Sequence, residues 1–396
     1  MISKLRRKMS RREVIQGSLI AGGTLLPGFD GICWPELLQT RPIDPFGGGR
    51  LLSALEFTEE ARMPMETKFG AELDGRLYTD LSKLTPENAI TPVGQFFIRT
   101  AASRLLGDQT PWQVQVGGQV RRPFTLNPEE LRKLAKPMGT HLLECSGNVR
   151  MAHFGMMSVA SWSGVPVSEI IEDAKLKTGG TRVLISGFDR YESSSVSSVP
   201  GASWVFTLEE LASAGAFLAT EMNGELLTED HGAPVRLVVP GWYGCASIKW
   251  VNEIAGVEEH VDATSQMQEY AARTLQKGVP QLARDYQPAT IDQAAMPIRI
   301  EKWFVQERIK YRVVGILWGG ARPVNVLEIR FNPEEEYVPV DHFQQTTNDP
   351  WSFWTHAWLP QRTGTYLIRL RVRDAGVTAR RLHVGDYVRS VAIMEV

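Results

Sequence analysis

Residues 364–373 read Gly-Thr-Tyr-Leu-Ile-Arg-Leu-Arg-Val-Arg, and their alternation decides the fold of the C-terminal part of the chain. Positions 366, 368, 370 and 372 carry Tyr, Ile, Leu and Val, whereas positions 369, 371 and 373 carry arginine. Successive side chains of a strand point to opposite faces, so this period of two is typical of a half-buried antiparallel strand.

Similar strand-like segments lie on both sides of this one. After about Asp292 the segments read IRIEKWFV, YRVVGILW, NVLEIRF, WSFWTHAW, TYLIRLRV and RSVAIMEV, and helix signals vanish. Six strands in roughly 100 residues predict an immunoglobulin-like β-sandwich, which we place at residues 288–396. Its boundary falls in a polar stretch between Pro288 and Pro297.

Residues 91–287 show a different, mixed pattern. Short apolar runs (QFFIRT, WQVQVGG, TRVLISGF and PVRLVVPG) are interspersed with helical candidates at 128–135, 167–174 and 208–214. Asn127 and Pro128 give the first helix a cap and a first-turn proline. No G-x-G-x-x-G joins a strand to a helix, which disfavours a Rossmann unit. The expected fold class is α+β, with a mixed domain before the sandwich.

The composition excludes several classes of protein. The chain has 396 residues, enough for two or three domains at roughly 100–200 residues each. Its 43 Lys and Arg nearly balance its 45 Asp and Glu, and the net charge of −2 disfavours a nucleic-acid partner. The three cysteines, Cys33, Cys145 and Cys245, form no Cys-x-x-Cys pair. This argues against a disulfide framework, a zinc ribbon and a covalent c-type haem.

The first 40 residues have the pattern of an export signal. A basic start precedes an apolar run from Val14 to Leu26 that glycines interrupt. Ser-Arg-Arg-Glu-Val-Ile at 10–15 is similar to a twin-arginine signal, which directs the export of folded, cofactor-loaded proteins. A basic amphipathic helix is the alternative. We expect a signal and linker at 1–40, an extension at 41–90, and a periplasmic protein.

Cys145 ends an apolar run, in His-Leu-Leu-Glu-Cys-Ser-Gly-Asn-Val-Arg at 141–150. The turn-forming Ser-Gly-Asn would place its thiol at the mouth of a strand, with Arg150 able to stabilise a thiolate. Three interpretations stay open from these residues alone. The cysteine is a small buried hydrophobe, a nucleophile with a remote histidine, or a soft thiolate ligand of a metal.

A second segment, His-Gly-Ala-Pro-Val-Arg-Leu-Val-Val-Pro-Gly at 231–241, is followed by Ser-Ile-Lys-Trp at 247–250. Arg236 interrupts an apolar strand, and His231 and Lys249 lie at turn edges on either side of it. Each cation alone is typical of a solvated or salt-bridged residue. Together, converging donors beside glycines indicate a site for an anion such as a phosphate.

Taken together, these motifs resemble the sulfite oxidase family of molybdopterin enzymes, from about Pro92 to the C-terminus. The resemblance rests on Cys-x-Gly-Asn-x-Arg, Asp-His-Gly-x-Pro-Val-Arg and the trailing Lys-Trp, in that order. It implies a Mo-molybdopterin cofactor with Cys145 as the protein ligand of molybdenum. Residues implied in binding the cofactor are Phe97, Ile98, Arg99, Asp189, His231, Arg236, Ser247, Ile248 and Lys249. Residues implied at the substrate pocket are Arg99, Arg150, Trp162 and Tyr270.

The resemblance implies that the domain at 91–287 oxidises a small sulfur oxyanion, as in sulfite to sulfate, by oxo transfer. Electrons would pass to an external c-type cytochrome, and the sandwich would form a homodimer. Two departures make the pocket less basic. Ala101 stands where many sulfite-oxidising members have a histidine, and Thr355 or His356 stands where some have an arginine. A sulfane dehydrogenase or another oxo-transfer enzyme is therefore the alternative.

Two functions of other classes are also consistent with parts of the sequence. A cysteine hydrolase would pair Cys145 with a histidine such as His153 or His231 and would need no molybdenum. An exported binding protein would use the sandwich and its Trp-rich strand for adhesion. The retained Cys145, Arg150, Arg236 and Lys249 argue against that second possibility.

Overall fold

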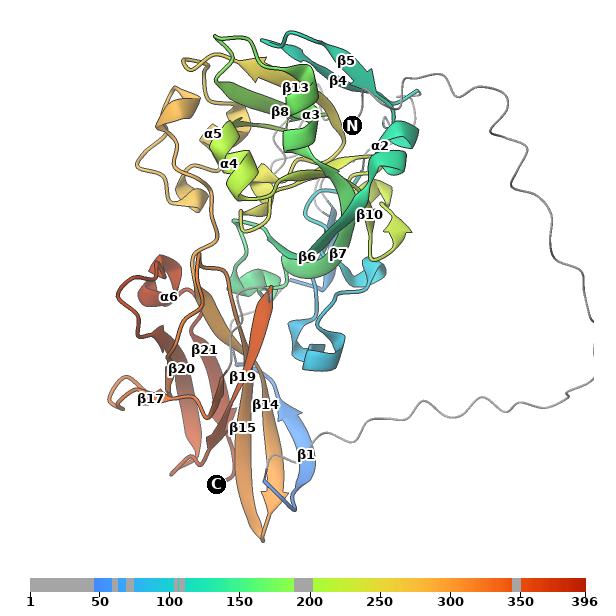
Figure 1. Ribbon diagram of the computed structural model, residues 1–396. Helices are drawn as coiled ribbons and strands as arrows, with labels where there is room; N and C mark the ends of the chain where they lie inside the picture. The colour runs from blue at the N-terminus through green and yellow to red at the C-terminus, as the bar shows by residue number, and fades with distance from the viewer. Residues whose placement is uncertain are drawn as a thin grey trace, which may run out of the picture.

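The computed structural model describes residues 46–58, 63–68, 75–102, 106, 111–188, 202–343 and 350–396. The predicted export signal, Cys33 and Asp189 lie outside these residues. A mixed part with most of the helices lies at the top of Figure 1, and a strand-rich part with the C-terminus lies at the bottom. No helix in the described part of the chain is long and apolar enough to span a membrane.

Two five-stranded sheets form the framework of the mixed part. The first has the order β11-β10-β7-β6, with β12 also paired to β10. Its strands are β6 (Lys136–Glu144), β7 (Met157–Pro166), β10 (Phe217–Met222), β11 (Glu225–Leu226) and β12 (Arg236–Val238). The second has the order β5-β4-β13-β8-β9. Its strands are β4 (Val114–Gly118), β5 (Phe124–Leu126), β8 (Arg182–Gly187), β9 (Ser203–Thr207) and β13 (Val251–Val257). Only β4 and β13 pair in parallel among these strands.

The helices of the mixed part are short and begin at recognisable caps. They are α2 (Pro128–Leu134), α3 (Val167–Ala174), α4 (Leu208–Ser213) and α5 (Ser265–Glu269). Asn127 and Glu130 form a reciprocal capping box at the start of α2, where Pro128 occupies the first turn. In α3 the buried residues recur at helical spacing and turn one face to the core. The three helices predicted from the sequence are confirmed, within one residue at their C-terminal ends.

The C-terminal part consists of two antiparallel sheets. The larger has the order β1-β14-β15-β19-β18, and the smaller the order β17-β16-β20-β21. Their bounds are β1 (Arg50–Leu55), β14 (Ala294–Val305), β15 (Arg308–Trp318), β16 (Leu327–Arg330), β17 (Val338–Pro339), β18 (His342–Phe343), β19 (Trp351–Trp358), β20 (Gly364–Val372) and β21 (Arg389–Ile393). In β20 the apolar positions from Tyr366 to Val372 are buried, as the alternation predicts. The mixed α+β fold is confirmed, and the immunoglobulin-like assignment of these sheets stays a prediction.

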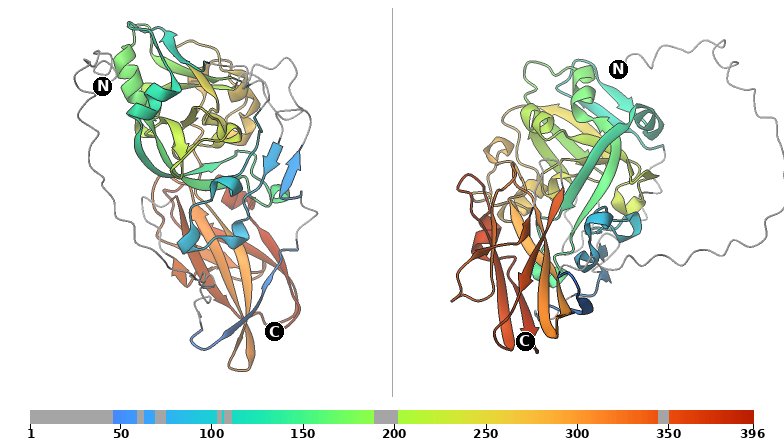
Figure 2. Two further views of the ribbon diagram at one scale, coloured as in Figure 1. Left: turned by 90° about the vertical axis from the view of Figure 1, so that its right-hand side faces the viewer. Right: turned by 60° about the horizontal axis from the view of Figure 1, so that its bottom comes forward.

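The extension before residue 91 connects the two parts. Its strand β1 pairs antiparallel with β14 at the edge of the C-terminal sheet, where Figure 1 draws it in blue. The chain then returns to the mixed part through β2 (Glu66–Lys68) and β3 (Gly75–Leu77) and three 3-10 turns, η1 (Leu81–Lys83), η2 (Pro86–Asn88) and η3 (Val93–Gln95). Figure 2 shows these segments beside the junction of the two parts. One apolar cluster contains side chains of both parts, so they pack as a continuous core.

Two local predictions were wrong. The run QFFIRT at 95–100 is a loop rather than a strand, with a single bridge between Ile98 and Leu77. Backbone groups of this loop bind side chains of the mixed part instead, as where the Phe97 N–H donates to the Ser158 hydroxyl over 3.0 Å. The C-terminal part also contains a helix, α6 (Arg380–Val384), although the sequence there carries no helix signal. A helix of five residues depends on tertiary packing rather than on propensity, because helix nucleation is costly.

Candidate active site

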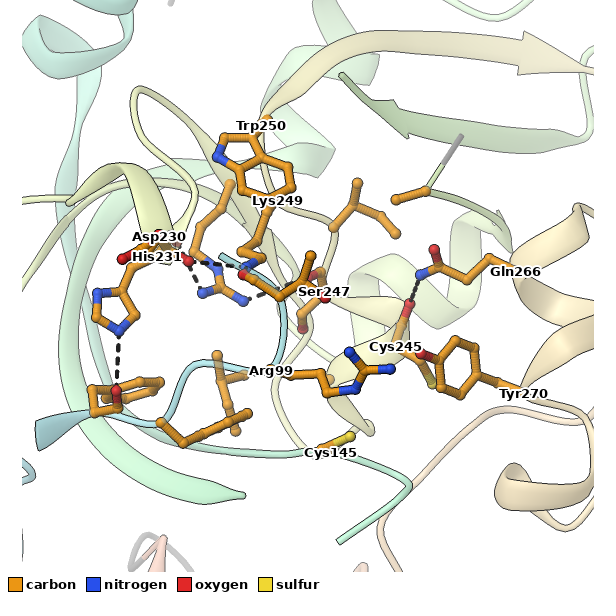
Figure 3. Close-up of a pocket in the computed structure, with 18 residues that line it drawn as sticks. Arg99, Cys145, Asp230, His231, Cys245, Ser247, Lys249, Trp250, Gln266 and Tyr270 are labelled. Carbon is orange, nitrogen blue, oxygen red and sulfur yellow. Dashed lines mark hydrogen bonds between the residues drawn. The ribbon is translucent and has the colours of Figure 1, made fainter. Parts of the chain in front are cut away.

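A pocket in the mixed part brings together residues that are far apart in the sequence (Figure 3). Its empty space, open mouth included, is about 890 Å³. Its walls are Phe96, Phe97, Arg99, Thr100, Leu143, Cys145, Ala202, Asp230, His231, Arg236, Gly244, Cys245, Ser247, Ile248, Lys249, Trp250, Gln266 and Tyr270.

The Cys145 thiol is presented by a tight turn at the end of β6. The Asn148 N–H donates to the Cys145 carbonyl over 2.9 Å, and the Gly147 N–H donates to the Cys145 Sγ over 3.4 Å. The Asn148 side chain is fully buried and accepts the Met156 N–H over 3.1 Å. The turn-forming residues after Cys145 thus hold the sulfur at the pocket, as the sequence predicts.

Side chains of the C-terminal part support this turn. The Trp318 Nε1–H of β15 donates over 2.9 Å to the carboxylate of Glu144, the buried residue before Cys145. Burial raises the pKa of Glu144. Arg381 of α6 donates over 2.8 Å to the Asn148 carbonyl. Both ends of the cysteine turn are therefore fixed by the neighbouring part of the molecule.

Arg236 is a buried cation at the pocket wall. Its Nη1 donates to the His231 carbonyl over 3.0 Å and its Nη2 to the Ser247 carbonyl over 3.4 Å. Its buried Nε has no hydrogen-bond partner, and no carboxylate forms an ion pair with Arg236 within the described ranges. Burial lowers the pKa of this guanidinium to about 10. Because a buried charge is costly unless paired, Arg236 is suited to an anionic ligand.

Gly232 allows Arg236 and Lys249 to approach each other. Its φ is +104°, and a Cβ there would lie 2.9 Å from the Arg236 Cβ and 3.1 Å from the Lys249 Cβ. Only glycine meets both conditions without strain. The Lys249 ammonium then donates to the Thr100 carbonyl and, over 2.9 Å, to the Asp230 carbonyl. Two cations are thereby held at one wall of the pocket.

His231 lines the pocket as a neutral imidazole. Its Nε2 lies 3.2 Å from the Phe96 carbonyl, and its Nδ1 lies 2.7 Å from the Thr228 hydroxyl. A carbonyl only accepts, so Nε2 carries the hydrogen and Nδ1 accepts from Thr228. Burial lowers the pKa of His231 to about 4. Both ring nitrogens form hydrogen bonds with protein groups. His231 thus connects two neighbours, since its ring binds the Phe96 carbonyl and its own carbonyl accepts from Arg236.

A second group of side chains surrounds Cys145. Arg99 points towards Tyr270 in Figure 3, and its charge lowers the pKa of the phenol. Burial raises the pKa of Tyr270 more than Arg99 lowers it, and the nearby Cys145 raises it further. The net result is a Tyr270 pKa of about 12. Burial also raises the pKa of Cys245 to about 12. Near neutral pH the pocket therefore presents a guanidinium, a protonated phenol and a protonated thiol next to Cys145.

Most of the predicted site residues meet at this pocket. Those that line it are Phe97, Arg99, Cys145, His231, Arg236, Ser247, Ile248, Lys249 and Tyr270. Ile98 is not part of the lining and pairs through its backbone with Leu77.

Arg150 and Trp162 lie elsewhere than the resemblance implies. Arg150 is exposed, and its Nη2 donates over 2.9 Å to the Val388 carbonyl of the C-terminal part. Trp162, on β7, is 2 % exposed and packs edge-on against Phe96. The Arg236 guanidinium lies 5.5 Å from the Trp162 ring centroid, so the indole supports the pocket wall from behind. Neither residue is part of the lining.

The geometry does not support a cysteine hydrolase. His153 is held by a 2.5 Å hydrogen bond between its Nε2 and the Met63 carbonyl. His153 does not line the pocket. The two ring nitrogens of His231 are both occupied, so this histidine is not placed to take a proton from Cys145. His356, the residue considered for a substrate-binding position, lies on β19 and contacts Asp341 and Phe331.

Several residues in or beside the pocket were not among the predicted site residues. They are Phe96, Asp230, Cys245, Trp250 and Gln266, which line the wall, and Arg273, which lies beside Gly147 at the cysteine turn. Four of them could have been found from their positions in the sequence, because they lie next to or within a few residues of predicted site residues. These are Phe96, Asp230, Cys245 and Trp250. Gln266 and Arg273 flank Tyr270 in the sequence, and nothing in that segment indicated which side chains face the pocket.

The residues fit a large anionic chelate with a soft metal. The unpartnered Nε of buried Arg236 offers a donor to a phosphate, and Cys145 offers one thiolate at the other side of the space. Residues 102–265 match the family described as oxidoreductase molybdopterin binding domain. Residues 102–265 thus form a molybdopterin-binding domain of the oxidoreductase type. The predictions of a member of the sulfite oxidase family and of a Mo-molybdopterin cofactor are confirmed.

The relatives belong to two enzyme groups. Sulfite oxidase of Arabidopsis thaliana is 28% identical over 203 residues, which cover 46% of this chain and 51% of that protein. Nitrate reductase [NADPH] of Fusarium oxysporum is 26% identical over 301 residues, which cover 62% of this chain and 32% of that protein. The chain thus spans about half or less of the length of these relatives.

One solved structure resembles the whole described fold. The crystal structure of the sulfane dehydrogenase SoxCD from Paracoccus pantotrophus superposes with a TM-score of 0.60 at 17% identity. The superposition covers 90% of this chain and 92% of that chain. It shows that the two proteins share a fold that includes both parts of the molecule.

Proposed function

We propose that this protein oxidises a small sulfur oxyanion, of the sulfite-to-sulfate type, in the pocket around Cys145. The observation that carries the proposal is the charge of the pocket. Arg99 lines it together with Cys145 and Tyr270, and remains available to a substrate when Arg236 and Lys249 bind the anionic end of a cofactor. The carboxylate in this lining, Asp230, accepts the Ala102 N–H over 2.7 Å. A cationic, partly dry cavity selects a small anion, because the attraction between charges strengthens as water is excluded.

The chain's own residues divide into two groups in this proposal. Arg236, Ser247 and Lys249 would hold the anionic end of the molybdopterin, and Cys145 would bind the metal through its thiolate. When bound, the molybdenum cofactor supplies two-electron oxygen-atom transfer. The protein's contribution is to orient both ligands and to fix charges around them before the reaction begins.

Arg99 and Tyr270 are the proposed substrate-contacting residues. Arg99 would bind the oxyanion through its guanidinium, whose planar donors match the oxygens of such an anion. Tyr270 keeps its proton near neutral pH because its pKa is raised to about 12. Its hydroxyl can therefore donate a hydrogen bond to an anionic oxygen of the substrate.

Sulfane oxidation is the second candidate, and one observation favours it. Neither residue at the two sequence departures adds a cation to the pocket. A Cβ on Gly75 of β3 would lie 2.8 Å from the Ala101 Cβ, so the extension closely covers that position. His356 faces Asp341 in the C-terminal part. A less basic pocket suits a substrate whose reacting sulfur carries less charge than sulfite.

The remaining parts of the proposal concern the protein's surroundings. We infer a periplasmic enzyme from the twin-arginine pattern at 10–15 and a homodimer from the family resemblance of the sandwich. The electron acceptor is proposed to be an external c-type cytochrome. No haem-attachment motif or dinucleotide fingerprint in the printed sequence offers an internal route.

Steady-state assays of the molybdenum-loaded protein test this proposal. Sulfite, thiosulfate, an organic sulfoxide and nitrate are compared, with cytochrome c or reduced viologen as the electron partner. We expect turnover of sulfite and a loss of roughly 10- to 100-fold in kcat/KM for Arg99→Gln. Arg132→Gln on the distant helix α2 serves as the charge-matched control. Nitrate as the sole substrate would overturn the proposal, and thiosulfate in preference to sulfite would select the second candidate.

A further inference from the structure

Arg273 lies outside the pocket lining, with its guanidinium beside the ring of Tyr270, which does line the pocket. It follows α5 and Tyr270 on the short turn η8 (Ala272–Thr274), and it is exposed. Its guanidinium carbon lies 5.4 Å from the centroid of the Tyr270 ring. The side chain therefore extends along the phenol towards the cysteine turn.

Arg273 and Cys145 share one neighbourhood. A Cβ built on Gly147 would lie 3.7 Å from the Arg273 Nη1 and 3.8 Å from the Cys145 Sγ. Gly147 carries no side chain, so none from this residue separates the guanidinium from the thiol. The Gly147 N–H, which donates to the Sγ over 3.4 Å, belongs to the same corner.

The charge of Arg273 acts on the proposed substrate site. Both Arg273 and Arg99 lower the pKa of Tyr270, so the fields of both cations reach the phenol oxygen. Among the residues that the structure describes, Arg273 forms no ion pair with a carboxylate. Its donors are consequently not committed to an acid of this chain.

Arg150 is the residue that the resemblance implies as a second cation at this corner. Its guanidinium is committed to the Val388 carbonyl, outside the pocket lining. Arg273 approaches the cysteine turn at Gly147 from η8, the short turn that follows Tyr270. The corner beside Cys145 thus keeps a positive charge although the residue implied by the resemblance lies elsewhere.

We propose that Arg273 is a substrate-binding and specificity-determining residue, which clamps the oxyanion against Arg99 from beside the Tyr270 ring. This inference rests on the proposed function, because it assigns a role at the same site. An exposed cation outside the lining contributes mainly to capture of the anion. Its removal should therefore raise KM and weaken binding of inert oxyanions, with little change in kcat.

The test compares Arg273→Gln and Arg273→Lys with Lys277→Gln in the molybdenum-loaded protein. Lys277 is an exposed cation four residues further on, and unlike Arg273 it approaches neither the Tyr270 ring nor Gly147, so it controls for net charge. Sulfite kinetics and titration calorimetry with sulfate are both measured. For Arg273→Gln we expect KM and the sulfate Kd to rise roughly tenfold, with kcat within about twofold. Arg273→Lys should recover part of the loss, and Lys277→Gln should match the wild type.

The two readouts separate this inference from the proposed function. If the wild type does not oxidise sulfite but binds sulfate more tightly than Arg273→Gln does, the function fails and the role of Arg273 stands. If Arg273→Gln keeps both KM and the sulfate Kd within about twofold of the wild type, the role of Arg273 is overturned. A wild type that binds no sulfate at all overturns it as well.

Discussion

Gly232→Ala tests whether the cationic wall depends on one backbone position. The new Cβ would lie 2.9 Å from the Arg236 Cβ and 3.1 Å from the Lys249 Cβ, at a φ of +104°. The left-handed backbone costs about 1–2 kcal/mol for alanine, and the crowding adds about 1–3 kcal/mol. We expect the free energy of unfolding to fall by about 2–5 kcal/mol in total.

The matched control for this variant is Gly241→Ala. Gly241 has a φ of +76°, and its added Cβ would meet no heavy atom within 4 Å. That variant should therefore lose only the backbone term, about 1–2 kcal/mol. The difference between the two variants measures the contact with the cationic wall.

Two assays decide the outcome for Gly232→Ala. Urea unfolding reports the free energy, and elemental analysis reports molybdenum per chain. Because Arg236 and Lys249 must shift to admit the methyl group, Gly232→Ala should also lose cofactor, whereas Gly241→Ala should keep it. Equal stability losses, together with wild-type molybdenum in both variants, would refute the reasoning.

Three further predictions concern buried groups around the pocket. Folded His231 has a pKa of about 4, whereas an unfolded histidine binds a proton below about 6.5. Its contribution of about 3 kcal/mol to stability is therefore complete above pH 6.5 and disappears as the pH falls towards 4. His231→Gln should lose less stability over that range, and parallel pH profiles from urea unfolding would contradict this. Arg236→Met should keep its fold, as measured by circular dichroism, but should bind molybdopterin at least roughly tenfold more weakly. Unchanged molybdopterin affinity would show that the anionic end of the cofactor binds elsewhere. Trp318→Phe should lower the free energy of unfolding by about 1–3 kcal/mol, since it removes a donor from the buried Glu144 carboxylate; an unchanged urea midpoint would argue against that hydrogen bond.

Patterns with a local physical cause could be predicted from the sequence. The alternation at 364–373, the capping residue Asn127 and the turn after Cys145 each act within a few residues, and the structure has all three. The convergence of Arg236 and Lys249 was also predictable, because both flank strand ends beside glycines.

Features that depend on long-range contacts could not be predicted in this way. The strand β1 pairs with β14, about 250 residues later, and its own sequence says nothing of that partner. Arg150 follows the cysteine turn as the family pattern requires, yet its side chain binds a carbonyl of the C-terminal part. Arg273 carries no motif, and only the folded chain brings it to Gly147.

The central claim is that the sulfur of Cys145 binds molybdenum. X-ray absorption at the molybdenum edge counts the sulfur neighbours of the metal in the wild type, in Cys145→Ser and in Cys245→Ser. Cys245 is the control, since it lines the same pocket and burial raises its pKa to about 12. We predict that Cys145→Ser loses one sulfur neighbour while Cys245→Ser keeps the wild-type number. An unchanged sulfur count in metal-loaded Cys145→Ser would contradict the account.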